Sequence, residues 1–315
     1  MKKSVMSSNE RNEYLLSYGF TNEDITRMYK KSNVLTGFKK ETIERKLNAL
    51  MNFGISKKDI IEIVNAFPQI LTLSEENTIS KYKYLLEFGF QMDDIITINK
   101  RTSFISTYSF NSLKKKINDL KDIGFSNKNI IKIIKSTPSI LTLSIENIIS
   151  KIKLFLTLGF TKEEILNIIL KFPAVITMSP NNIVNKVNNI VSLGFTMEEI
   201  INIAKFFPII CSFSIETIED KIKYIMSFGY TLSNVKNMIK NYPSILSMST
   251  ENLHDKINFY KSINLMDIII SDTKQLMISL KVVYARYMFY KNIGINIDKN
   301  NYTLLFIKNK DFERK

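Results

Sequence analysis

The sequence predicts an all-α protein, a solenoid of about eight helical repeats of 35 residues each, on three periodic observations. Seven of the nine glycines are spaced 35 residues apart, namely Gly19, Gly54, Gly89, Gly124, Gly159, Gly194 and Gly229. Five prolines share a second register, Pro68, Pro138, Pro173, Pro208 and Pro243. Serines share a third, Ser74, Ser109, Ser144, Ser179, Ser214 and Ser249. A period this strict indicates one supersecondary unit that buries its apolar face against its neighbours.

The first helix of each repeat, called helix A here, is expected to begin just after the glycine. Thr161 and Glu164 have the spacing of a capping box, in which the hydroxyl and the carboxylate satisfy free backbone N–H groups. In the repeat after Gly124, residues Ile130, Ile133 and Ile134 lie on one face of such a helix. The proline of each repeat ends helix A, because it forces the preceding residue out of the helical conformation.

A short apolar stretch follows the proline, and a second helix, called helix B, follows that stretch. Residues 140–143 are too few for a full helix and predict a tight turn packed into the core. Pro180 directly follows Ser179, which fits a serine N-cap with proline in the first helical position. Helix B then ends at the next glycine, which permits the left-handed conformation after a helix.

The repeats run from one end of the chain to the other, so we expect a single solenoid over residues 1–315. Residues 1–20 are expected to form an N-terminal capping half-repeat, and residues 265–315 a shortened last repeat and C-terminal cap. The N-terminus has no apolar run, so we expect no cleavable presequence and a cytoplasmic protein. No apolar run reaches the ~18 residues of a membrane span, and we expect no membrane association.

The net charge of +14 and the pI of about 9.5 favour an anionic partner, with nucleic acid first among the candidates. The alternative is that an AT-rich source genome makes lysine and asparagine abundant. A single cysteine, Cys211, and a single histidine, His254, exclude a Cys/His metal site. Glu163 and Glu164 fit helix capping better than metal binding. We therefore expect no enzyme activity, no metal and no cofactor.

Three motifs recur together with substitutions at some positions: L-x-x-L-G-F-[ST] before helix A, P-x-I-L-x-x-S at the turn, and S-x-E-N-I-x-x-K-I at the start of helix B. This combination resembles the mitochondrial transcription termination factor (mTERF) family over nearly the whole chain. The resemblance implies a superhelical solenoid with two helices and a short 3₁₀ turn per repeat. It also implies that a concave basic side binds double-stranded DNA, or RNA in some members, and thereby modulates transcription or its termination. Family members are typically organellar, which leaves a mitochondrial location open.

The basic residues of the chain are mostly lysines, with only six arginines, which is unlike a protein that recognises a specific base sequence. The planar guanidinium of arginine makes bidentate contacts with guanine, whereas the ammonium of lysine is a point charge suited to phosphate. We therefore expect backbone binding with modest sequence specificity.

One basic position recurs in every helix B, and we predict that it contacts nucleic acid. The row consists of Arg11, Lys46, Lys81, Lys116, Lys151, Lys186, Lys221 and Lys256, with Arg286 equivalent in the shortened last repeat. On a helical wheel Lys151 lies about 100° from the centre of the apolar face, so stacked repeats would set these side chains in a row. The alternative is that the aliphatic stems cover the edge of the core while the ammonium groups remain in water.

A second basic row lies in the last turn of helix A, at Lys30, Lys100, Lys135, Lys205 and Lys240. A cation there offsets the helix dipole by ~0.3–1 kcal/mol, which explains the row as well as phosphate contact does. The other flank of helix B alternates between Asn and Lys, as at Asn118 and Lys153. An alternative function is a monomeric helical-repeat scaffold that binds an acidic segment of a partner protein.

Overall fold

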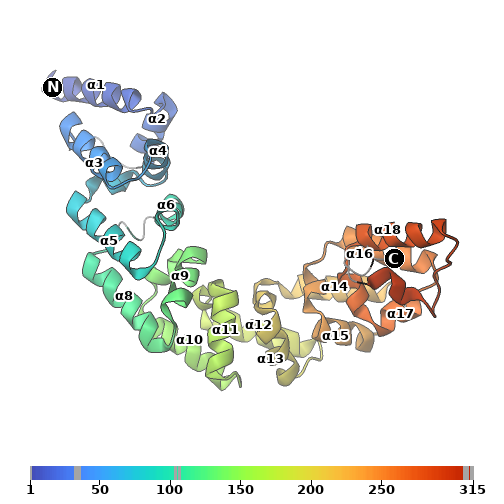
Figure 1. Cartoon of the computed structure of the whole chain (residues 1–315). Helices are drawn as coiled ribbons and strands as arrows, with labels where there is room; N and C mark the ends of the chain where they lie inside the picture. The colour runs from blue at the N-terminus through green and yellow to red at the C-terminus, as the bar shows by residue number, and fades with distance from the viewer. Residues whose placement is uncertain (1, 32–36, 103–104, 106–107, 308–311, 313–315) are drawn as a thin grey trace. The chain divides into compact units, whose positions relative to one another are not determined.

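The computed structural model describes residues 2–31, 37–102, 105, 108–307 and 312 (Figure 1). Within these ranges the chain forms α-helices and short 3₁₀ helices and contains no strand. The all-α prediction is confirmed. The expected order of helix A, turn and helix B recurs along the chain.

The helices of the two kinds alternate in sequence. The helices A are α2 (Asn22–Lys31), α4 (Lys57–Ala66), α6 (Met92–Arg101), α9 (Asn127–Ser136), α11 (Lys162–Lys171), α13 (Met197–Phe206), α15 (Leu232–Asn241) and α17 (Met266–Ser271). The helices B are α1 (Lys2–Ser17), α3 (Lys40–Asn52), α5 (Glu75–Phe88), α8 (Phe110–Ile123), α10 (Ile145–Thr157), α12 (Pro180–Ser192), α14 (Ile215–Met226), α16 (Thr250–Ser262) and α18 (Leu280–Asn292). The 3₁₀ turns are η2 (Pro68–Thr72), η3 (Pro138–Thr142), η4 (Pro173–Thr177), η5 (Pro208–Ser212), η6 (Pro243–Ser247), η7 (Thr273–Met277) and η8 (Tyr302–Phe306).

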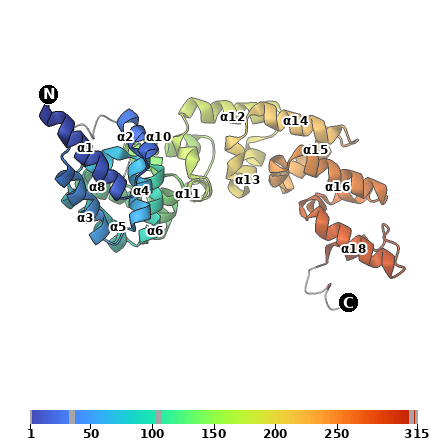
Figure 2. The ribbon, with the colours of Figure 1, turned by 90° about the horizontal axis from the view of Figure 1, so that it is seen from above.

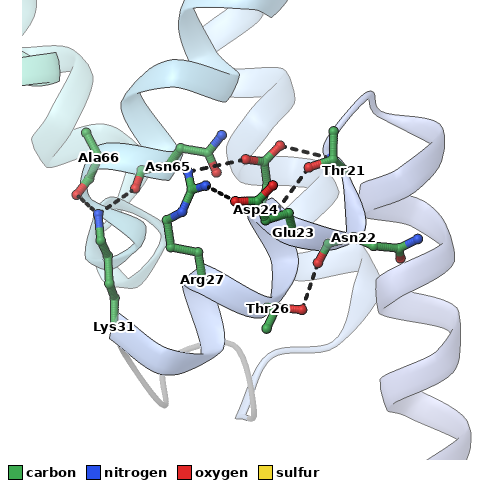
Figure 3. A network of polar contacts seen from close by, with 9 residues as sticks. All are labelled: Thr21, Asn22, Glu23, Asp24, Thr26, Arg27, Lys31, Asn65 and Ala66. Atoms are coloured by element: carbon green, nitrogen blue, oxygen red, sulfur yellow. Dashed lines mark hydrogen bonds and ion pairs between the residues drawn. The ribbon is translucent and has the colours of Figure 1, made fainter.

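The helices A other than α6 and α17 begin after a serine or threonine cap, the predicted signal. Figure 3 shows the first one, where the backbone N–H of Thr21 donates to the Asp24 carboxylate and the N–H of Asp24 donates to the Thr21 hydroxyl. The same reciprocal pair occurs at Thr196 and Glu199. These caps satisfy backbone N–H groups that have no partner inside the helix.

The ends of the helices also follow the predicted signals. Each register proline begins a 3₁₀ turn, and the serine after that turn accepts the N3 backbone N–H of the next helix B, as Ser179 does at the start of α12. The last repeat has Asn264 where glycine was expected, and Asn264 adopts a left-handed φ of 56°. Asparagine tolerates this conformation better than most residues with a side chain.

The structure divides into two compact units, Met1–Phe155 with Ile165–Thr177 and Leu156–Glu164 with Met178–Lys315. In the first unit, α1, α3, α5 and α8 pack in succession, as do α2, α4 and α6. In the second unit, α12 packs on α14 and α13 on α15 (Figure 1 and Figure 2). The single-solenoid boundaries stay a prediction, although one repeat pattern runs through both units. Part of the predicted C-terminal cap, residues 308–311 and 313–315, lies outside the described residues.

The core is built mainly from isoleucine. Ile130, Ile133 and Ile134 of α9, which were predicted to share a buried face, are each fully buried. Helix A of one repeat also approaches the glycine before helix A of the previous repeat. A Cβ atom built on Gly89 would lie 3.2 Å from Cδ1 of Ile131 on α9.

Gly89→Ala is expected to destabilise the protein more than Gly54→Ala. Both glycines have a left-handed φ, 115° and 102°, at which alanine costs about 1–2 kcal/mol. Only the methyl group at Gly89 meets a neighbour within 4 Å, which adds up to about 1 kcal/mol of overpacking. Urea unfolding of both variants measures the difference. Equal losses would show that Ile131 moves aside without cost.

Candidate nucleic-acid interface

The basic row on helix B lies in the interior, where consecutive repeats meet. Seven of its nine members are buried: Arg11, Lys46, Lys81, Lys151, Lys221, Lys256 and Arg286. Lys116 and Lys186 are half-buried. Lys81 is the extreme case, with 0% of its surface exposed. The row therefore does not form the exposed stripe that the helical wheel suggested.

Each member of the row donates a hydrogen bond to a backbone carbonyl further along the chain. The acceptors, in chain order, are the carbonyls of Phe38, Leu73, Tyr108, Leu143, Ile176, Phe213, Met248, Leu276 and Leu305. For Lys81 the Nζ–O distance is 2.8 Å, and for Lys186 and Lys221 it is 2.6 Å. Six of the nine bonds join residues 27 positions apart.

The acceptor position explains why a cation recurs there. Leu73 directly follows η2 and directly precedes the cap of α5, so its carbonyl lies at the C-terminal end of a 3₁₀ turn. Carbonyls at a helix C-terminus have no partner within the helix, and a cation is favoured there. A long basic side chain from the preceding helix B satisfies the carbonyl and ties one repeat to the next.

Burial changes the acid–base properties of these lysines. Desolvation lowers the pKa of Lys81 from 10.5 to about 8. Desolvation also lowers the pKa of four other members of the row, Lys116, Lys151, Lys221 and Lys256. The structure thus gives the ammonium groups a backbone partner in the interior, rather than leaving them in water at the edge of the core.

Contact between this row and nucleic acid stays a prediction, and the geometry favours a structural role. An ammonium that is buried and already bonded to a carbonyl is poorly placed to reach a phosphate. Nine of the 44 lysine and arginine residues belong to the row. The net charge of +14 therefore overstates the positive charge that the surface presents to a ligand.

Four of the five members of the second basic row form ion pairs between successive helices A. Lys100 lies 2.7 Å from Asp59, Lys135 2.5 Å from Asp94, Lys205 3.3 Å from Glu164 and Lys240 2.8 Å from Glu199. The hydrogen bond from Lys100 holds the pKa of Asp59 below its usual value, and the bond from Lys240 does the same for Glu199. These carboxylates also lie in the first turn of their helices. Each one therefore stabilises the start of its own helix and also pairs with a lysine of the next repeat.

The other flank of helix B faces outward. Lys83, Asn118, Lys153, Asn188 and Lys223 are exposed there. Lys223 pairs with Glu219 at 3.5 Å, one turn away on α14. This alternating row is available to a ligand, but its positive charges are widely spaced.

Lysines are concentrated on the consecutive helices α8 and α9, a feature that the recurring positions did not indicate. Residues 110–136 contain seven lysines and only two acidic residues. Three of the lysines are exposed on α8, Lys114, Lys115 and Lys121, and three on α9, Lys128, Lys132 and Lys135. A count of charges in a short window of the sequence could have found these lysines, because they are concentrated in one segment and do not recur at a fixed period.

The remaining candidate groups show no arrangement typical of catalysis. Among the described residues, no three His, Cys, Asp or Glu side chains form a group that could hold a metal ion. Burial raises the pKa of the Cys211 thiol to about 11, which makes the reactive thiolate scarce. His254 lies 3.0 Å from the Tyr224 hydroxyl and 2.7 Å from the Asn258 amide. In the part of the chain that the structure describes, no helix is both long and apolar enough to cross a membrane.

The recurring unit of helix, 3₁₀ turn and helix, joined by buried cations, defines a helical-repeat protein. The family model for mTERF matches residues 14–313, and the chain belongs to the mTERF family. No curated protein matches the sequence.

Proposed function

We propose that this protein binds nucleic acid, most favourably duplex DNA, through the phosphate backbone and without enzymatic activity. The observation that carries the proposal is the membership of a basic helical-repeat chain in the mTERF family. In keeping with the family resemblance, the binding would modulate transcription or its termination. Duplex RNA is the second candidate ligand, since it offers the same phosphate chemistry.

The exposed surface supports backbone binding over base readout. Six of the seven lysines on α8 and α9 are exposed, whereas Arg11 and Arg286 are buried and bonded within the protein. Lysine neutralises phosphate without reading a base edge. Binding should therefore be sensitive to salt and tolerant of sequence.

Fluorescence anisotropy with duplex DNA, single-stranded DNA and duplex RNA tests the proposal. At roughly 50 and 200 mM salt, the logarithm of the affinity for duplex DNA is expected to fall linearly with the logarithm of salt, by ~0.9 for each phosphate contact. Duplexes of unrelated sequence are expected to bind within a factor of about ten, since each base-specific contact adds ~1–3 kcal/mol of discrimination. The proposal is wrong if none of the three ligands binds at the lower salt concentration.

A further inference from the structure

An open hollow of about 590 Å³ lies on α9 of the first compact unit. Three lysines line it, Lys128, Lys132 and Lys135, together with Asn129 and, from α11 of the next repeat, Leu170. We call it the α9 hollow.

The three lysines follow one another at positions i, i+4 and i+7 of α9, so their side chains share one face of the helix. They span about 10 Å along the helix axis. Helix α9 contains no acidic residue. Among the described residues, neither Lys128 nor Lys132 has an ion-pair partner, whereas Lys135 pairs with Asp94 of the preceding repeat.

The hollow lies where the recurring ion pair between helices A is missing. At four other junctions a carboxylate pairs with a lysine 41 residues further on, namely in Asp59–Lys100, Asp94–Lys135, Glu164–Lys205 and Glu199–Lys240. The same positions here are occupied by Asn129 and Leu170. Both partners are replaced together, so the carboxylate that this position supplies at the four paired junctions is missing beside Lys128 and Lys132.

The replacement leaves positive charge beside an open space. The first turn of α9 adds to that charge, because the N-terminal end of a helix carries a partial positive charge. A rigid anion could enter the hollow and interact with Lys128 and Lys132 without breaking an existing ion pair.

We propose that the α9 hollow binds backbone phosphates of duplex nucleic acid, one phosphate taking the position that a carboxylate occupies at the four paired junctions. This inference rests on the proposed function and assigns it to a site. Duplex DNA fits the lysine face because it presents one negative charge per ~1.7 Å of axis, so several phosphates fall within the length of α9.

The first test removes the two unpaired lysines. Lys128→Ala/Lys132→Ala is expected to weaken binding to duplex DNA by about tenfold or more at roughly 100 mM salt and to reduce the salt slope by ~1.8, which corresponds to two phosphates. The matched control, Lys83→Ala/Lys153→Ala, removes the same charge from exposed positions on α5 and α10. It is expected to change the affinity by less than about threefold, because those lysines stand apart from the hollow.

A second variant keeps the net charge of the protein unchanged. Asn129→Asp/Leu170→Lys introduces the ion pair found at the four paired junctions and places a carboxylate in the hollow. Binding of duplex DNA is expected to weaken about fivefold, while the urea midpoint stays the same or rises, since an exposed ion pair contributes up to ~1 kcal/mol. Weaker binding with an intact fold cannot then come from a change in total charge.

The possible outcomes distinguish a failure of the proposed site from a failure of the proposed function. If both lysine pairs weaken binding equally, or if Asn129→Asp/Leu170→Lys binds as tightly as wild type, the α9 hollow is not the site although nucleic-acid binding stands. If wild type binds no nucleic acid, the proposed function fails. If wild type binds a polyglutamate peptide but no duplex, and Lys128→Ala/Lys132→Ala releases the peptide, the hollow serves a protein partner and the inference is overturned.

Discussion

Lys81→Ala is expected to lower the free energy of unfolding by about 2–4 kcal/mol. The side chain is fully buried, and its Nζ donates to the Tyr108 carbonyl at 2.8 Å. Alanine removes three buried methylene groups, each worth ~0.8 kcal/mol, and leaves the carbonyl without this donor, at ~1–3 kcal/mol. Relief of the desolvation of the charge offsets part of that loss. Urea unfolding at neutral pH, followed by circular dichroism, measures the change.

Lys83→Ala is the control, because Lys83 is exposed two residues further along α5. It is expected to change the stability by less than about 0.5 kcal/mol. Lys81→Met retains most of the buried stem and should lose less than Lys81→Ala. If Lys81→Ala unfolded like wild type but bound duplex DNA with a shallower salt slope, the sequence-based prediction of phosphate contact would be right and the structural role wrong.

The sequence predicted the helix boundaries well because they depend on local backbone constraints. Pro180 fits only the first position of a helix, and α12 begins at that residue. Gly89 follows α5 in the left-handed conformation that glycine adopts at low cost. Such residues act through their own φ and ψ angles, so no knowledge of the tertiary packing was needed to interpret them.

The role of the basic row could not be predicted in the same way. The helical wheel placed Lys151 at the flank of the apolar face, but only the stacking of repeats decides whether that flank meets water or a neighbour. In the structure it meets the carbonyl of Ile176 in η4, 25 residues further on. The 35-residue period showed that a basic residue recurs at this position of helix B. The structure shows the reason, which is a hydrogen bond to a backbone carbonyl.

The ion pairs between helices A could not be predicted from the sequence for the same reason. Asp59 and Lys100 each fit a helix terminus on their own, so the dipole explained both without any contact between them. Their partnership becomes visible only when α4 and α6 are placed side by side. Only then does the absence of the pair at Asn129 and Leu170 stand out, together with the unpaired lysines beside it.

Burying a cation costs free energy, and the recurrence of a buried or half-buried lysine or arginine in each repeat indicates that it fixes the register of packing rather than adding net stability. Replacing a buried ionic group by an apolar one is often neutral or stabilising, whereas such groups can select one packing over its alternatives. With an apolar side chain at this position, helix B could shift along the 3₁₀ turn of the next repeat without losing a specific contact. A hydrogen bond from Lys221 to the carbonyl of Met248 does not tolerate such a shift.

The stability of wild type relative to Lys81→Met is expected to rise with pH between about 8 and 10.5. Burial lowers the pKa of Lys81 in the folded protein, so within this range the unfolded chain binds a proton that the folded chain has lost, and stability rises with pH. Below about 8 both states are protonated and the cost of the buried charge is fully present. The change should reach no more than about 3 kcal/mol, since one pKa unit corresponds to 1.36 kcal/mol. Urea unfolding of both proteins at matched pH values measures it, and the tyrosines that ionise in this range cancel because both proteins contain them. A difference that does not change with pH would mean that Lys81 ionises in the fold as it does in water.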